Sequence, residues 1–182
     1  MSNIKTIPVR TWYLEMRTPP EGNAPEFSFE YNIVRALKPT VSFYQYLYTQ
    51  VGKGYSWYNR LLMFEKELQE NIHDDAVEIS VLWCSGVPAG FCELDCRNSN
   101  ETEIVYFGIL PEFRGRGLGP RFLDWTVHKA WASDPQRVWL HTCELDDKAA
   151  MPMYLKAGFI QYDEQMETQK VIYPTNGSGS AD

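Results

Sequence analysis

The sequence predicts an α/β fold of the α+β kind, in which a central, mixed but mostly antiparallel sheet is flanked by helices. Two observations support this prediction. The 182 residues are 44% hydrophobic and 14% aromatic, the composition of a globular domain with its own core. The expected elements follow in the order strand, helices, three strands, helix, strand, helix, strand, which places helices against one sheet. We expect one domain over residues 1–173 and a disordered tail over residues 174–182, whose composition is that of a flexible linker.

The N-terminal part predicts one strand and two helices. Residues 9–16, VRTWYLEM, are rich in β-branched and aromatic side chains and favour a strand. The proline-containing residues 17–26 favour a loop, because prolines lack a backbone donor and bias their neighbours away from helix. Residues 40–51 repeat apolar side chains at helical spacing, and the glycines that follow end this helix. A second helix is expected over residues 56–72, with its first serine as the N-cap.

The middle of the chain predicts three successive strands. Residues 77–83 and 89–96 flank a short turn that contains glycine, as in a hairpin. Residues 103–110, EIVYFGIL, are almost continuously apolar, so we expect this strand at the centre of the sheet. Gly108 within it is consistent with a bulge or with close approach of another part of the backbone.

The C-terminal part alternates helices and strands. Residues 120–132 predict a helix with a proline in its first turn, and residues 137–143, RVWLHTC, predict a strand. A short helix is expected over residues 148–159, ending at a glycine suited to the C′ position. The last strand or strands fall within residues 159–173.

Charge and apolar pattern argue against several function classes. The net charge of −7 does not favour a nucleic-acid partner, because affinity for phosphate backbones comes largely from clustered Lys and Arg. No apolar run approaches the roughly 18–20 residues of a membrane span. The first ten residues, MSNIKTIPVR, lack the apolar segment of a secretory signal. We therefore expect a cytoplasmic protein with neither a nucleic-acid nor a membrane partner.

The four cysteines do not form a metal-binding pattern. Cys92 and Cys96 fall on one face of an expected strand, and none of the three histidines lies at ligand spacing from them. We expect ordinary thiols and no metal, in a reducing compartment.

Residues 113–122, FRGRGLGPRF, predict an anion site. They follow the expected central strand and precede a helix, whose first N–H groups are unpaired and lie at the positive end of the helix dipole. The glycines let an anion approach the backbone, and Arg114, Arg116 and Arg121 add full charges. The segment lacks the Gly-Lys-Ser/Thr ending of a Walker A loop and the last glycine of the dinucleotide motif. The predicted ligand is a pyrophosphate group.

The pattern Arg114-x-x-Gly117-x-Gly119 resembles the acyl-CoA loop of the GNAT superfamily of N-acetyltransferases. A second segment matches the family in order and spacing after the strand RVWLHTC: Asp147, Ala150, Tyr154, Gly158 and Phe159. The resemblance is strong over residues 77–165 and weak over residues 1–76, where the family varies.

The resemblance implies the GNAT fold and acetyl-CoA as the acyl donor, with transfer directly to an amine in a ternary complex. It implies that the central strand is bulged near Phe107 to Ile109, which would free N–H groups for the thioester and the pantetheine arm. The implied cofactor-binding residues are Phe107, Gly108, Ile109, Arg114, Gly115, Arg116, Gly117, Leu118, Gly119 and Asp147. The sequence departs from the family at Asp147, where Asn is frequent, and at Pro152, which falls in the first turns of a helix.

The chemistry needs a proton donor for the departing thiolate and a group that takes the proton of the amine. The resemblance places Tyr154 beside the sulfur as the acid. It places Glu103 as the base, as in the histone-acetyltransferase branch of the family. Glu93 and Asp95 on the preceding strand, or a chain of waters, are alternatives for the base.

The acceptor is the least determined part of the prediction. Aromatic side chains with nearby carboxylates suit a cationic amine, and Trp57 or Tyr58 is expected to line its pocket. His141 could face either this site or the core, and Cys143 is expected to be a strand residue rather than an acyl carrier.

The predicted function is that of an N-acetyltransferase that moves acetyl from acetyl-CoA to a primary amine of a small molecule. Acetylation of a protein Lys or N-terminal amine is an alternative within enzymes. A CoA-binding module without catalysis is the alternative from another class. The sequence leaves the acyl length, the acceptor and formation of a homodimer open.

Overall fold

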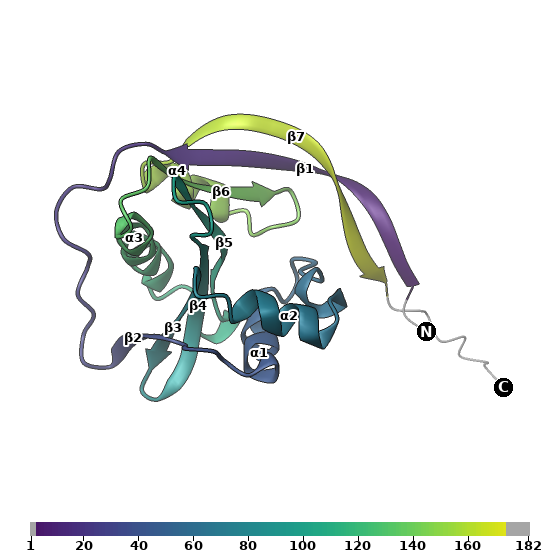
Figure 1. Ribbon diagram of the computed structural model, residues 1–182, viewed down its shortest axis with the longest axis horizontal. Coiled ribbons are helices and arrows are strands. Elements are labelled where there is room, and N and C mark those ends of the chain that lie inside the picture. The colour runs from purple at the N-terminus through teal and green to yellow at the C-terminus, as the bar shows by residue number, and fades with distance from the viewer. Residues whose placement is uncertain (1–2, 174–182) are drawn as a thin grey trace.

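The computed structural model describes residues 3–173, which form a seven-stranded sheet in the order β2-β3-β4-β5-β6-β1-β7 (Figure 1). Only β5 and β6 pair in parallel, so the sheet is mixed and mostly antiparallel, as predicted. The elements are β1 (Asn3–Met16), β2 (Tyr31–Arg35), α1 (Val41–Val51), η1 (Arg60–Leu62), α2 (Glu65–Ile72), β3 (Val77–Cys84), β4 (Val87–Asp95), β5 (Glu101–Ile109), η2 (Pro111–Phe113), α3 (Leu118–Trp131), β6 (Arg137–Cys143), α4 (Ala150–Lys156) and β7 (Ile160–Tyr173).

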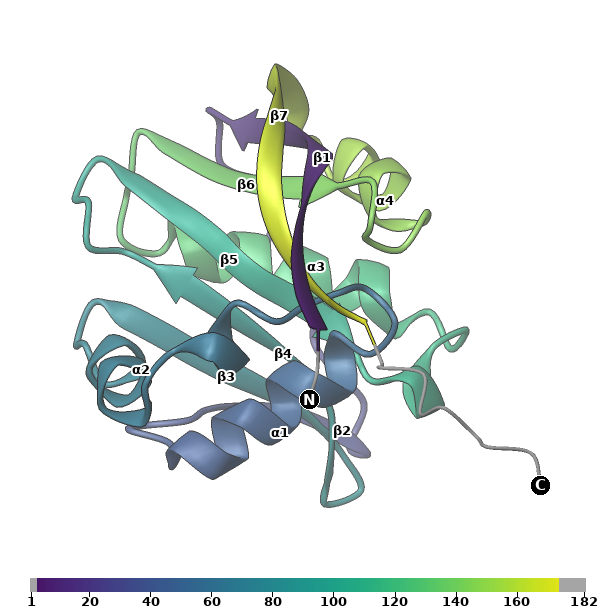
Figure 2. The same ribbon diagram turned by 90° about the vertical axis from the view of Figure 1, so that its right-hand side faces the viewer.

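The helices cover both faces of the sheet and bury two apolar clusters. Helices α1 and α2 lie on one face and α3 and α4 on the other (Figure 2). Tyr44 and Leu47 of α1 are fully buried in the first cluster, and Phe122 and Leu123 of α3 are fully buried in the second. Strand β5 stands fourth of seven between these layers, which confirms its expected central position. None of the helices within residues 3–173 is both long and apolar enough to span a bilayer.

The parallel pair β5 and β6 is short, and this opens the sheet. The two strands pair only from Glu101 with Arg137 to Glu103 with Trp139, and then diverge (Figure 2). A gap between diverging strands leaves backbone groups of β5 free for another partner. The divergence places the ends of β5 and β6 on the two sides of one opening.

The bulge of β5 lies earlier than expected. Tyr106 pairs with Glu93 and Ile104 pairs with Leu94, so Val105 is the extra residue. The expected bulge near Phe107 to Ile109 is therefore wrong in position. Gly108 serves close packing instead.

Gly108 lies close against the end of α1. A Cβ built on this residue would lie 2.3 Å from Cγ1 of Val51, at the end of α1. On the other side, a Cβ on Gly90 of β4 would lie 2.6 Å from the Gly108 carbonyl oxygen. The strand can pair regularly at Gly108, with Phe91 of β4, only because neither position carries a side chain.

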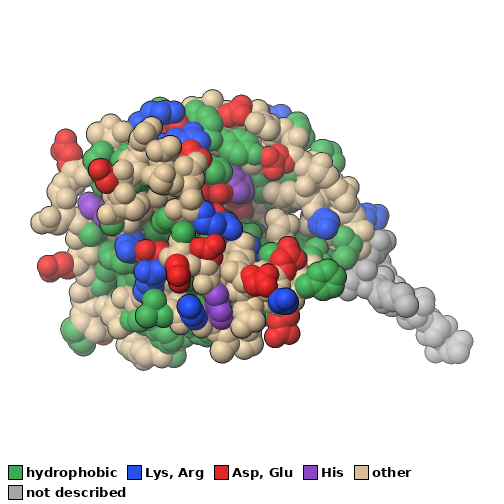
Figure 3. All heavy atoms as spheres, viewed as in Figure 1, with side chains coloured by type: hydrophobic (Ala, Val, Ile, Leu, Met, Phe, Trp, Pro, Cys, Tyr) green, Lys and Arg blue, Asp and Glu red, His purple; other side chains and the backbone are tan. Residues whose placement is uncertain are grey.

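Strands β1 and β7 form a long antiparallel pair from Asn3 with Tyr173 to Glu15 with Ile160. Strand β1 pairs with β6 only over residues 11–16, so the remainder of the pair projects beyond the sheet as a two-stranded ribbon (Figure 1). The surface is hollowed beneath this ribbon (Figure 3).

The second predicted helix is wrong over its first half. Ser56 has a φ of 59° and is not an N-cap, and α2 begins only at Glu65. The intervening segment carries Arg60, whose guanidinium is buried against the carboxylate of Glu93 on β4. A continuous helix is interrupted where this tertiary contact draws the chain toward the sheet.

Strand β2 was not predicted, because five residues at the edge of a sheet carry little periodic signal. The predicted disordered tail over residues 174–182 lies outside the described residues.

Candidate functional site

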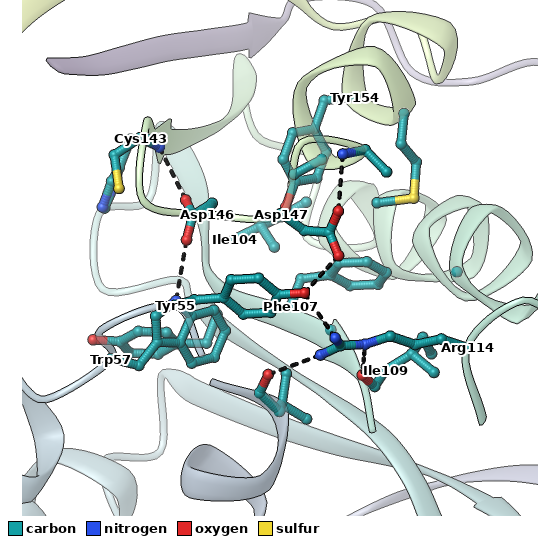
Figure 4. Close-up of a pocket in the computed structure, with 18 of the residues that line it drawn as sticks. Tyr55, Trp57, Ile104, Phe107, Ile109, Arg114, Cys143, Asp146, Asp147 and Tyr154 are labelled. Atoms are coloured by element: carbon teal, nitrogen blue, oxygen red, sulfur yellow. Dashed lines mark hydrogen bonds between the residues drawn. The ribbon is translucent and has the colours of Figure 1, made fainter. Parts of the chain in front are cut away.

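A cavity of about 480 Å³ lies in the opening between β5 and β6 (Figure 4). It is lined by the end of α1 and the segment after it, by β5, by the glycine loop (residues 114–119), and by the region from the end of β6 into α4. Gln169 of β7, within the two-stranded ribbon, also lines the cavity. Eight of the ten predicted cofactor-binding residues line it: Phe107, Gly108, Ile109, Arg114, Gly115, Gly117, Gly119 and Asp147.

The glycine loop turns its backbone toward the cavity. Gly115 and Gly117 both have a φ of 74°, in the left-handed region that glycine adopts without strain. Gly117 is the residue that caps the N-terminus of α3. Within residues 3–173 the N–H groups of Gly115, Arg116 and Gly117 donate no hydrogen bond, which leaves them free for an anion.

Two predicted loop residues do not line the cavity. Leu118, the first residue of α3, is 6% exposed and packs into the apolar cluster beneath this helix. Arg116 lies over the ring of Phe113 and donates to the carbonyl of Glu112. Each could contribute only its backbone N–H in this arrangement.

The guanidinium of Arg114 is held by the protein itself. Its Nε donates to the carbonyl of Ile109 over 3.1 Å, and its Nη2 donates to the carbonyl of Val51 over 3.2 Å. Its Nη1 donates to the Tyr55 hydroxyl over 2.7 Å. Arg114 therefore fastens the glycine loop to the end of α1, and the free backbone N–H groups are the more available anion donors.

Two aromatic side chains cross the cavity to two consecutive aspartates (Figure 4). The Tyr55 hydroxyl donates to Asp147 Oδ2 over 2.5 Å, and Trp57 Nε1 donates to Asp146 Oδ1 over 3.1 Å. We call these four residues the aromatic clasp. The Tyr55 hydrogen bond is the main cause that lowers the pKa of Asp147, with a smaller effect of the Ala149 N–H. The clasp joins the segment after α1 to the turn between β6 and α4.

Tyr154 lies in the wall of the cavity and is 8% exposed. Its ring packs edge-on against Phe159, 6.3 Å between centroids. Burial raises the pKa of its phenol well above the ordinary value of 10.0. The hydroxyl is therefore protonated at neutral pH, so it carries a proton that a neighbouring group could accept.

Glu103 and His141 form a pair at the point where β5 and β6 separate. His141 Nδ1 lies 3.5 Å from Glu103 Oε1, and the two side chains are 40% and 21% exposed. His141 lines the cavity, whereas Glu103 is not among its lining residues. The Glu103 carboxylate is the main cause that raises the pKa of His141, and Asp146 and Glu167 add to this effect.

The other carboxylates considered as the base are already paired. Glu93 is 1% exposed, binds Arg60, and accepts a hydrogen bond from the Tyr44 hydroxyl. Asp95 is paired with Arg97. Neither lines the cavity, so of the carboxylates considered only Glu103 reaches it, through its histidine neighbour.

Of the two predicted acceptor residues, the structure brings only Trp57 to the cavity; Tyr58 is not among the lining residues. The Trp57 indole packs against Tyr48 and Tyr106, with centroids 5.4 Å and 5.1 Å away. Sequence reasoning missed Tyr55, although its position next to a glycine-rich turn was a usable signal.

Metal ligation has no support in the described part of the chain, where no group of three His, Cys, Asp or Glu side chains could hold an ion.

A family model described as the acetyltransferase (GNAT) family matches residues 40–159. The chain belongs to this family. The match spans the glycine loop, β6 and α4, the segments that carry the resemblance. No curated protein matches the chain by sequence.

Solved structures share the GNAT fold at low sequence identity. A GCN5-related N-acetyltransferase from Sphaerobacter thermophilus matches with a TM-score of 0.65 and 15% identity, over 91% of this chain and 53% of that one. A spermidine N-acetyltransferase from Vibrio cholerae, in complex with CoA and spermine, matches with a TM-score of 0.58 and 16% identity, over 80% and 96%. An aminoglycoside acetyltransferase from an uncultured soil metagenomic sample matches with a TM-score of 0.58 and 13% identity, over 73% and 90%.

Several matching chains are longer than this one. The chain spans 62% of a functionally unknown protein from Staphylococcus epidermidis and 61% of a GCN5-related N-acetyltransferase from Kribbella flavida. At these identities the likeness establishes the fold.

Proposed function

We propose that this GNAT protein transfers an acetyl group from acetyl-CoA to a primary amine of a cationic small molecule. The observation that carries the proposal is one cavity that joins the free N–H groups of the glycine loop to the buried hydroxyl of Tyr154. The first feature suits a pyrophosphate and the second suits a departing thiolate.

The donor would lie along β5. The N–H groups of Gly115, Arg116 and Gly117 would hold the pyrophosphate at the positive end of the α3 dipole. The bulge at Val105 and the divergence from β6 leave part of the β5 backbone facing the cavity. Free N–H groups there would polarise the thioester carbonyl as negative charge develops on its oxygen.

The reaction exchanges one bond for another. The amine nitrogen attacks the thioester carbon, the new C–N bond forms, and the C–S bond breaks. The thiolate takes a proton from Tyr154. The amine loses a proton to the pair formed by Glu103 and His141. The products are an amide and free CoA, and no group of the protein is acylated.

The charge around the cavity favours a cationic acceptor. Asp146 and Asp147 stand on one wall, and the Glu103 carboxylate lies behind His141. Trp57 and Tyr106 line the cavity, where aromatic rings would attract a cation. Two proteins of similar fold are a spermidine N-acetyltransferase and an aminoglycoside acetyltransferase, and both named substrates are cationic amines, which supports the proposal without fixing the acceptor.

The test is release of CoA thiol from acetyl-CoA across polyamines, amino acids, aminoglycosides, arylamines and Lys peptides. We expect turnover with one class of cationic small amine. We expect Tyr154→Phe to lower kcat about 10²-fold while acetyl-CoA affinity is kept. Tyr46→Phe is the matched control, because that hydroxyl is on the exposed side of α1.

Two outcomes would contradict the proposal. Turnover only with Lys peptides would identify a protein substrate instead. Tight acetyl-CoA binding with no turnover on any amine would favour a non-catalytic CoA-binding module.

A further inference from the structure

The position of His141 follows from the geometry of three strands. On β6 it lies two residues beyond Trp139, the last residue that pairs with β5. Its other neighbour, β1, continues alongside and pairs Tyr13 with His141, with ring centroids 6.0 Å apart. The imidazole therefore packs against Tyr13 on the β1 side. On the β5 side no paired strand covers it, and there it lines the cavity.

Glu103 occupies the matching position on β5. It pairs with Trp139, so its side chain shares a sheet face with His141 and reaches Nδ1 of the imidazole. Because Glu103 does not line the cavity and His141 does, a substrate in the cavity meets the imidazole before it meets the carboxylate. The separation of 3.5 Å is long, as hydrogen bonds of this kind often are before substrate binds.

We propose that His141 takes the proton of the acceptor amine through Nε2, and that Glu103 is a positioning residue that acts through it. This inference rests on the proposed function and deepens it. A carboxylate at Nδ1 favours the tautomer with hydrogen on that nitrogen, which leaves the lone pair on Nε2 for the substrate.

The proton balance of the reaction closes with His141, Tyr154 and solvent. As the C–N bond forms, the amine N–H proton passes to His141 Nε2, and the C–S bond breaks to give a thiolate. Tyr154 gives its proton to that thiolate. The imidazolium returns its proton to solvent, for which its 40% exposure provides access, and the Tyr154 phenolate is reprotonated from solvent.

The charges around His141 set the direction of its pH dependence. Carboxylates face it from three elements: Glu103 on β5, Asp146 in the turn after β6, and Glu167 on β7. Tyr13 on β1 stays a neutral neighbour, because burial and its hydrogen bond to Glu167 raise the pKa of its phenol. The pKa of His141 therefore lies above its ordinary 6.5, and the neutral, proton-accepting form appears above that raised value.

The experiment measures kcat/KM against pH for the wild type, His141→Gln and Glu103→Gln, with the acceptor found in the amine panel. We expect the wild-type rate to rise with pH through a midpoint above 6.5. His141→Gln should lose this rising limb and about 10²-fold in rate. Glu103→Gln should keep the limb but move its midpoint to lower pH, since the largest cause of the raised pKa is gone.

Controls separate chemistry from folding. Acetyl-CoA affinity and the melting temperature should be unchanged in His141→Gln, and His73→Gln should behave as the wild type, because His73 contacts the carbonyl of Pro39 away from the cavity. A His141→Gln variant that keeps both its rate and its rising limb would overturn the proposal. So would a rising limb that disappears in Glu103→Gln alone, which would make the carboxylate the direct base.

A second readout does not need turnover. Nitrogen NMR of labelled histidines, with His141 assigned by its loss in His141→Gln, reports the neutral tautomer and the midpoint. We expect hydrogen on Nδ1 and a midpoint that falls in Glu103→Gln; hydrogen on Nε2 would contradict the proposal. If the wild type turns over none of the amines, the proposed function is contradicted. The NMR result separately supports or contradicts the pairing of His141 with Glu103.

Discussion

Replacing Gly108 by alanine is expected to destabilise the protein through one identifiable contact. The new Cβ would lie 2.3 Å from Cγ1 of Val51, whereas ordinary contacts fall at 3.4–4 Å, so the overlap exceeds 1 Å. Val51 is 2% exposed and β-branched, so its side chain cannot rotate away freely. Overpacking of this kind costs about 1–3 kcal/mol. For a chain of this size that corresponds to a fall in melting temperature of roughly 2–12 °C.

The assay is a double-mutant cycle followed by urea and thermal unfolding. Val51→Ala alone should cost about 2 kcal/mol from the methyl groups it removes. Combined with Gly108→Ala it should cost less than the sum, because the clashing atom is absent. Gly119→Ala is the control, since its Cβ would meet Met153 Sδ at an ordinary 3.5 Å and the residue lies in the first turn of α3. Strict additivity at positions 51 and 108 would refute the clash as the cause.

Two further predictions concern buried charge. Arg60→Met should cost about 3–5 kcal/mol in urea unfolding, because the Glu93 carboxylate, 1% exposed, would be left without its cation; replacing both residues by apolar ones should recover much of the loss, and a double variant as unstable as the single one would contradict this. Arg17 and Arg137 hold the pKa of Glu15 below its ordinary 4.5, so its contribution to stability is complete above that pH and is lost as the pH falls below it toward the folded value. Glu15→Gln should therefore flatten the decline of melting temperature with acid in this range, and an unchanged slope would exclude Glu15 as a source of acid sensitivity.

The parts of the fold that the sequence predicted are those with a dense local signal. The strand predicted over residues 137–143 has the observed bounds of β6, because a short apolar run with β-branched and aromatic side chains lies there between clear breaks. The glycine loop was predicted from its glycines and arginines before a helix, Tyr154 was predicted from the resemblance to the GNAT family, and both line the cavity. Local periodicity suffices where neighbours along the chain are also neighbours in the structure.

The parts that were not predicted depend on contacts between distant segments. Ser56 satisfied the local rule for an N-cap, but the burial of Arg60 against β4 overrode it. Tyr55 finds Asp147 across 92 residues of chain, which no local pattern encodes. The sequence did not decide whether His141 faces the core or the site. It lines the cavity because β5 and β6 diverge beyond Trp139.

The aromatic clasp joins two walls of the cavity by hydrogen bonds. Tyr55 accepts from Arg114 beside the glycine loop and donates to Asp147 before α4, so a ligand that displaces this one hydroxyl alters both walls at once. Linkage is reciprocal: whatever factor the donor applies to the affinity for the acceptor, the acceptor applies to the affinity for the donor. If donor and acceptor both displace the Tyr55 hydroxyl, the affinity for either one would depend on whether the other is bound, and Tyr55→Phe would reduce that dependence.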